Sequence, residues 1–118
     1  MIVAAPERAA EKLRAFLTIT RDKKIFNDAY DLYYFDAHVL TPADWSLLPT
    51  IVAAKLNSPG CIIPKESDLV RLFDDQIERV AAGWGTASTV VAVEPLPEWA
   101  TLAPRVQRFQ SVLPLRKG

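Results

Sequence analysis

The spacing of apolar residues is the feature that most constrains what this chain of 118 residues can fold into. Over most of the chain they recur at steps of three and four residues, which is the period of one face of an α-helix. Half of the residues are hydrophobic, and the length suffices for one hydrophobic core but not for two. The sequence therefore predicts a mostly α fold, about five helices in one compact domain that covers residues 1–118.

Prolines and capping residues indicate where the helices begin and end. Thr41 followed by Pro42 and Asp44 is a typical helix start, and Gly83 is a typical helix end. Asp22 is the expected N-cap of the second helix. The expected helices cover residues 6–19, 23–36, 42–56, 66 or 67 to 83, and 97–113. Their predicted core faces carry Ala9, Leu13, Phe16, Leu17, Ile25, Ala29, Leu32, Phe35, Leu69, Val70, Phe73, Ile77, Val80, Trp99, Leu102, Val106, Phe109 and Val112 or Leu113.

Three segments interrupt this helical pattern. Pro49 is expected to kink the third helix or split it in two, and Pro104 weakens the first half of the last one. The valine-rich segment 88–93 favours a short extended structure, although the sequence offers no obvious strand to pair with it.

Composition excludes several classes of function. Lys plus Arg and Asp plus Glu both number 14, so no net charge draws the chain to nucleic acid or to an anionic membrane. One candidate for a local basic patch is the C-terminal set of Arg105, Arg108, Arg116 and Lys117, although such a set is more often just a soluble C-terminus. No apolar run approaches the roughly 20 residues that span a bilayer, and the first residues do not resemble a signal peptide. We expect a cytoplasmic protein.

The chain holds one cysteine and one histidine, which exclude an internal disulfide and a zinc site built from this chain alone. Cys61 lies beside two isoleucines and is expected to be a small buried hydrophobe. His38 has no recognisable catalytic partner, and a histidine at a helix end is a common structural feature. The sequence contains neither a glycine-rich phosphate loop nor a nucleophile elbow.

The segment NDAYDLYYFDAH, residues 27–38, concentrates acids and aromatics. Asp28 and Asp31 are three residues apart and share one face of a helix, on or near the flank opposite its apolar stripe. Two interpretations are open: a solvated helix edge, or a site for a charged ligand.

Two segments together resemble the second half of the AbiEii-type nucleotidyltransferase toxins, the toxin partners of bacterial abortive-infection and toxin–antitoxin pairs. PERAAEKLRAFL, residues 6–17, is similar to a family helix that reads E-x-x-x-A-E-K-L-x-A-L. NDAYDLYYF is similar to the next helix, R-D-x-x-D-L-Y, with Asn27 where an arginine is usual. Later helices match in order, so that the resemblance covers residues 6–113.

The resemblance implies specific roles. Lys12 would reach the phosphates of a nucleoside triphosphate, and Glu7 and Glu11 would orient it. Asp31, with Asp28 near it, would hold Lys12 or approach the metal-bound nucleotide. Mg²⁺, an antitoxin and a transfer RNA acceptor are implied only through the family. Without a family, these charges would be ordinary surface pairs worth about 0–1 kcal/mol each.

The family carries its metal-binding acids in an N-terminal half, in a G-S motif followed by D-x-D or D-x-E, which this sequence lacks. Asp28 and Asp31 cannot readily replace those acids, so we expect no catalysis by this chain alone. The alternative is a helical interaction module that binds an antitoxin, the missing N-terminal domain or a second copy of itself; exposed tryptophans at Trp45, Trp84 or Trp99 would favour it. An unrelated enzyme is a third hypothesis, which no motif supports.

Overall fold

The computed structural model describes residues 4–19, 22–64, 67–89, 91 and 95–114, and within them it shows five α-helices and no strand. Three α-helices continue into short helices of other types: the π-helix η1 (Phe35–Val39) and the 3₁₀-helices η2 (Trp84–Thr89) and η3 (Arg108–Val112). The predicted mostly α fold is confirmed. The α-helices are α1 (Ala5–Thr18), α2 (Asp22–Tyr34), α3 (Pro42–Leu56), α4 (Leu69–Gly83) and α5 (Trp99–Gln107).

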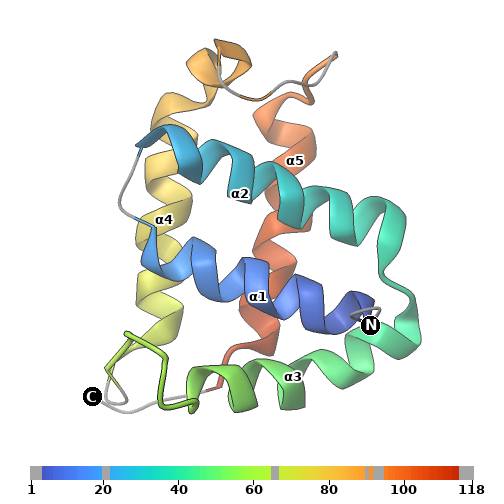
Figure 1. Ribbon diagram of the computed structural model, residues 1–118. Helices are drawn as coiled ribbons and strands as arrows, with labels where there is room; N and C mark the ends of the chain where they lie inside the picture. Colours follow the sequence, from blue (N-terminus) through green and yellow to red (C-terminus); the bar gives the residue numbers. More distant parts are fainter. Residues whose placement is uncertain (1–3, 20–21, 65–66, 90, 92–94, 115–118) are drawn as a thin grey trace.

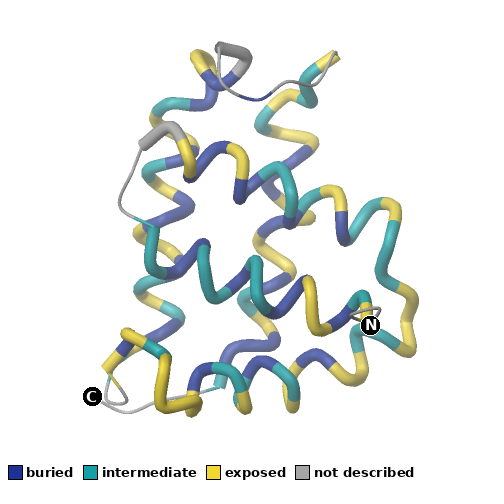
Figure 2. Tube along the Cα trace, viewed as in Figure 1, coloured by how far each residue is buried: buried dark blue, intermediate teal, exposed yellow. Residues whose placement is uncertain are grey.

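The helices are arranged in two layers. α1 and α2 run antiparallel and cross in front of α4 and α5, while α3 lies beside α1 along the lower edge in the view of Figure 1. α1 therefore lies between α2 and α3 and also contacts α4. α2 contacts both helices of the rear layer. Figure 2 shows that the buried residues of the two layers recur along each helix, as expected where one side of each faces the crossing.

The predicted stripe residues form much of the core, which also includes Leu48, Val52 and Leu56 of α3, for which no stripe was predicted. Phe16 of α1 and Phe73 of α4 are fully buried, with ring centroids 5.6 Å apart, and they join the two layers at their crossing. Val70 is half-buried rather than buried. The other predicted stripe residues that the structure buries are Ala9, Leu13, Leu17, Ile25, Ala29, Leu32, Phe35, Leu69, Ile77, Val80, Leu102, Val106, Phe109, Val112 and Leu113.

The three tryptophans pack against other rings instead of standing in solvent. Trp84 is buried, and its indole N–H donates to the carbonyl oxygen of Pro97 at 2.9 Å. Trp99 is half-buried with its ring centroid 6.1 Å from that of Trp84. Trp45 is half-buried and lies 4.7 Å from the ring of Phe109. None of the three is an exposed aromatic anchor for a partner.

The start of α3 is the one that the sequence predicted. The Thr41 side chain accepts from the backbone N–H of Asp44 at 3.1 Å, and the Asp44 carboxylate accepts from the backbone N–H of Thr41 at 2.9 Å, which is a capping box. The expected split at Pro49 is absent, since α3 is one helix from Pro42 to Leu56. Pro49 itself is exposed.

Other helix ends differ from the predicted ones by a few residues. α4 begins at Leu69 rather than at 66 or 67, because Asp68 is its N-cap and accepts from the backbone N–H of Arg71 at 3.1 Å. α2 begins with Asp22 itself, and the residue before it lies outside the described residues. α5 begins at Trp99 and continues through Pro104.

Half of the predicted extended segment at 88–93 falls outside the described residues. Residues 88 and 89 belong to η2, so they are helical rather than extended. Val91 is buried, and its backbone N–H donates to the carbonyl oxygen of Ala87 at 2.9 Å, which continues the helical pattern of bonding. Residues 90 and 92–94 are not described.

α4 supplies the hydrogen bonds that the last turn of α1 lacks. The side-chain amide of Gln76 is buried and donates to the carbonyl oxygens of Phe16 at 2.7 Å and Ile19 at 2.8 Å. The guanidinium of Arg79 donates to the carbonyl oxygen of Ile19 as well, at 2.9 Å. The final carbonyls of a helix have no intrahelical partner, so this contact both caps α1 and ties it to the rear layer.

Gly83 ends α4, as expected, but for a reason that only the fold reveals. A Cβ atom built on Gly83 would lie 2.6 Å from Cζ of Phe26, whose ring is buried between α2 and Trp84. A glycine is needed at this position because the Phe26 ring of α2 lies so close to it. Gly85, two residues later, has open space where its Cβ would lie.

We therefore predict that Gly83→Ala lowers the free energy of unfolding by about 1–3 kcal/mol, because the buried Phe26 ring must move. Gly85→Ala is the matched control and should change it by less than about 0.5 kcal/mol. Urea denaturation followed by circular dichroism measures both. Equal effects of the two substitutions would contradict the close approach.

Candidate functional site

An open groove lies between α1 and the segment in which α2 continues into η1. Its volume is about 710 Å³, within the range of small-molecule sites in proteins. The wall formed by α1 is mainly charged, and the wall formed by α2 and η1 is mainly apolar. The groove is lined by Arg8, Glu11, Lys12 and Ala15 from α1 and by Asp31, Tyr34, Phe35 and Val39 from α2 and η1.

The amphipathic character of α1 explains why these side chains meet there. Leu13 and Phe16 point into the core and hold α1 against the other helices. Arg8, Lys12 and Ala15 follow each other at steps of four and three residues, so they form one row on a neighbouring side of the helix. That row faces the groove.

The π-helix η1 shapes the opposite wall. The backbone N–H of Leu40 donates to the carbonyl oxygen of Phe35 at 2.8 Å, five residues back, which widens the turn. Phe35 and Val39 both line the groove. Single π-turns of this kind are rare in proteins as a whole. Those that do occur are frequently found at functional sites.

Lys12 and Asp31 meet in this groove, a contact that was expected only through the family resemblance. The Lys12 ammonium Nζ lies 2.7 Å from Oδ2 of Asp31 and 3.8 Å from Oδ1 of Asp28. The hydrogen bond to Asp31 raises the pKa of Lys12 above its ordinary value, although partial burial opposes it. Lys12 therefore remains a cation throughout the physiological pH range.

Asp28 lies elsewhere than the sequence indicated. The predicted position was an outer flank of the second helix, but its side chain is only 2% exposed, because α1 packs over that flank. Its Oδ2 atom is buried and makes no hydrogen bond with any described residue. Burial raises the pKa of the Asp28 carboxyl, and the charges of Lys12 and Lys24 oppose this rise.

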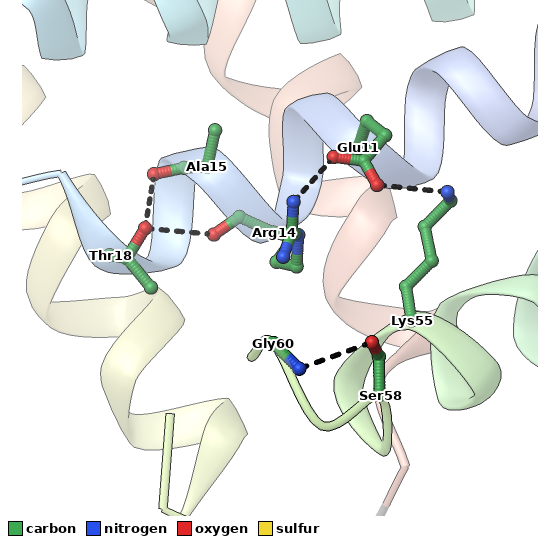
Figure 3. Close-up of polar contacts among 7 residues, drawn as sticks. All are labelled: Glu11, Arg14, Ala15, Thr18, Lys55, Ser58 and Gly60. Atoms are coloured by element: carbon green, nitrogen blue, oxygen red, sulfur yellow. Dashed lines mark hydrogen bonds and ion pairs between the residues drawn. The ribbon is translucent and has the colours of Figure 1, made fainter. Parts of the chain in front are cut away.

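Glu11 bonds to Arg14 and Lys55, whereas the family resemblance implied that it orients Lys12. It accepts from Arg14 at 2.7 Å and from Lys55 at 2.8 Å, so that it links α1 to α3 (Figure 3). These two cations, Lys55 first, lower the pKa of Glu11. The carboxylate is half-exposed, which limits each pair to about 0–1 kcal/mol of stability.

Glu7 lies outside the groove. It is exposed in the first turn of α1, where an acidic side chain favours the positive end of the helix dipole. It forms no ion pair with a described residue. Of the five predicted site residues, the structure therefore brings together Lys12, Asp28 and Asp31, with Glu11 at the edge and Glu7 apart.

Sequence reasoning missed Arg8 as a groove residue, whereas Tyr34 was among the three tyrosines, with Tyr30 and Tyr33, that the sequence offered as flanks for a base. The Arg8 guanidinium carbon lies 5.7 Å from the ring centroid of Phe35, a cation–π contact across the groove. Tyr34 is 46% exposed and stacks at a tilt on His38, with ring centroids 4.9 Å apart. The four-residue step from Arg8 to Lys12 was the signal that could have indicated a second groove cation.

The predicted basic patch at the C-terminus is already neutralised in part. Arg105 and Arg108 donate to the two carboxylate oxygens of Asp36 at 3.1 and 2.8 Å. Arg108 also lies over the ring of Trp45, 4.1 Å from its centroid. The other two members of the patch, residues 116 and 117, lie outside the described residues. This cluster joins η1 to α5 and η3.

The described ranges hold neither a group of metal ligands nor a helix that could span a membrane. No three His, Cys, Asp or Glu side chains of these ranges gather closely enough to hold a metal ion. Cys61 is half-buried, not fully buried as expected. None of the helices in the described part of the chain has the length and apolar character needed to cross a membrane.

Comparisons of this chain with protein-family models, with curated proteins and with solved structures found no match. The geometry of the groove is therefore the basis for assigning a function.

The burial of Asp28 predicts how stability depends on pH. Because the folded state raises the pKa of this carboxyl above its ordinary value of 3.8, it binds the proton more tightly than the unfolded state does. Stability contributed by this group therefore falls as pH rises from 3.8 through the raised pKa. Asp28→Asn should be more stable than the wild type at neutral pH, and the gain should shrink in acid.

Urea denaturation at a series of pH values from about 3 to about 8 measures this difference. Asp75→Asn is the matched control, because Asp75 is an exposed aspartate of α4. A difference between Asp28→Asn and the wild type that is the same at every pH would contradict a raised pKa.

Proposed function

We propose that the groove beside Lys12 binds the phosphates of a nucleoside triphosphate. In this proposal the chain is the nucleotide- and substrate-side helical domain of a nucleotidyltransferase-like toxin, as its resemblance to the AbiEii-type family implies. The observation that carries the proposal is the position of the Lys12 ammonium, held 2.7 Å from Asp31 on the wall of a groove of about 710 Å³.

The two cations that line the groove, Arg8 and Lys12, supply donors for an anion, and the two carboxylates that line it, Glu11 and Asp31, balance their charge. An ammonium has three N–H donors, and the hydrogen bond to Asp31 uses one of them. Arg8, one turn earlier on α1, lines the same groove. A phosphate there would receive charge-assisted hydrogen bonds from both cations, which are stronger than neutral ones.

The aromatic side of the groove provides a surface for a base. Tyr34 lines the groove and is 46% exposed, so one part of its ring is open to a ligand. Phe35 and Val39 supply the apolar wall beside it. Offset stacking on a tyrosine and apolar contact are common ways to hold a planar base, and they tolerate any of the four bases.

The two aspartates do not fit a Mg²⁺ site. Glu11, the other carboxylate of the groove, is paired with Arg14 and Lys55, and the ammonium of Lys12 lies within 3.8 Å of both aspartates. A cation at that position already offsets part of their charge, and Mg²⁺ requires near-octahedral oxygen ligands. We therefore propose that this chain by itself binds the nucleotide without transferring a nucleotidyl group.

The proposal predicts that the full chain binds at least one of ATP, CTP, GTP and UTP in the presence of Mg²⁺. Lys12→Ala should weaken binding about tenfold or more, because it removes a charged hydrogen-bond donor to phosphate. Asp31→Ala should have a smaller effect. The Lys12 cation remains in that variant, although the Asp31 carboxylate no longer fixes its position. Isothermal titration calorimetry measures these affinities.

Arg71→Ala is the control for a general loss of positive charge, because Arg71 is an exposed arginine of α4, which does not line the groove. It should bind nucleotide as the wild type does. The proposal is wrong if none of the four nucleotides binds, or if Lys12→Ala and Asp31→Ala both bind with the affinity of the wild type.

A further inference from the structure

Asp28 is a buried carboxyl group beside the groove, and one of its two acceptor atoms is unused. Its side chain is 2% exposed, and its Oδ2 atom makes no hydrogen bond within the described part of the chain. A carboxylate that has lost its water is costly to keep ionised unless a cation or donors replace that water. The cation that does so is the Lys12 ammonium, 3.8 Å from Oδ1. The protonation of Asp28 therefore depends on the charge of Lys12.

Lys12 links this buried carboxyl to the groove. Its side chain is 41% exposed, it lines the groove, and its ammonium donates to Asp31 at 2.7 Å. An anion that enters the groove approaches this same ammonium. The negative charge of that anion offsets the positive potential that Lys12 exerts on Asp28, because both act over a few ångströms in a partly buried region.

The charges of this cluster are unequal. Lys12 carries one positive charge, and the ionised Asp28 and Asp31 carry two negative ones. Glu11 is paired with two other cations, so it leaves the cluster unchanged. A phosphate beside Lys12 therefore adds negative charge where negative charge is already in excess. Nearby like charges favour the neutral form of a carboxyl group.

We infer that Asp28 takes up a proton from the solvent when a phosphate group binds Lys12, so that the groove binds phosphates more tightly as pH falls. This inference rests on the proposed function of the groove and adds a means of regulation to it. The proton neutralises the Asp28 carboxyl and leaves one positive and one negative charge in the cluster. A neutral acid is also less costly to bury than a carboxylate.

The other charges around Asp28 agree with this direction. Burial is the largest influence on the Asp28 pKa and raises it, while Lys12 and then Lys24 lower it. Asp31, on the same helix, raises it further. Among the described residues, α4 and α5, which also pack against α2, contribute no charged group that acts on this pKa. Lys12 is the stronger of the two opposing cations, so a phosphate that offsets it raises the Asp28 pKa again.

The dependence on pH follows from this difference between the free and the bound state. The Asp28 pKa lies above 3.8 in the free chain and higher still in the complex. The affinity for phosphate is therefore greatest below the pKa of the free state, and it falls as pH rises through the pKa of the complex. A single proton changes the affinity by at most about tenfold per pH unit.

Isothermal titration calorimetry of the full chain tests the inference. The wild type and Asp28→Asn are titrated with ATP, CTP, GTP and UTP plus Mg²⁺ at pH values from about 5 to about 8. Asparagine has the shape of the protonated carboxyl and does not titrate. The affinity of the wild type relative to Asp28→Asn should rise at least about threefold from the highest to the lowest pH.

The ratio of the two affinities removes other effects of pH. The phosphates of the ligand titrate themselves, and they do so equally with both proteins. His38, which stacks on Tyr34 of the groove, is also present in both. Asp75→Asn, at an exposed aspartate of α4, is the matched control and should follow the wild type at every pH. Repeating the titrations in buffers of different ionisation enthalpy counts the protons, and the wild type should take up more of them than Asp28→Asn.

NMR titration of the Asp28 carboxyl carbon tests the link to Lys12 without any nucleotide. Lys12→Ala should shift the titration midpoint of Asp28 to higher pH, because it removes the compensating cation. An unchanged midpoint would overturn the inference. So would nucleotide binding in which the ratio of wild type to Asp28→Asn is the same at every pH, and the proposed function would then still stand. Failure of both proteins to bind any nucleotide at any pH would overturn the proposed function as well.

Discussion

The packing of α1 between α2 and α3 is the constraint on which the rest of the structure depends. One side of α1 buries Leu13 and Phe16 against the rear layer, which holds the helix in place. Its position then leaves the row of Arg8 and Lys12 beside α2, where the groove lies. The C-terminal carbonyls of α1 bond to Gln76 of α4, so the helix cannot slide along its axis without losing buried hydrogen bonds.

The same packing accounts for the unusual electrostatics of the groove. Asp28 is covered by α1, and one of its oxygens has no hydrogen bond within the described part of the chain. A buried carboxylate is costly unless a cation lies near it, and Lys12 provides that cation at 3.8 Å. Lys12 thus compensates a charge inside the fold while it presents a donor to the groove. The structural role of this residue and its proposed contact with phosphate are therefore linked.

The groove and α3 lie on different sides of α1 and differ in their chemistry. The groove combines two cations and two carboxylates with an apolar wall. The exposed row of α3 has no charge. Glu11 connects the two regions, because it lines the groove and accepts from Lys55 of α3.

The sequence by itself determined the helical class, the core stripes and the start of α3, because helical period and capping are local properties. The meeting of Lys12 with Asp31 also followed, from the family resemblance. Only the tertiary structure decided that Asp28 is buried, that Gly83 must be small beside Phe26, and that η1 opens a wider turn. Each of these depends on which helix lies against the residue, and neighbours distant in sequence leave no local pattern.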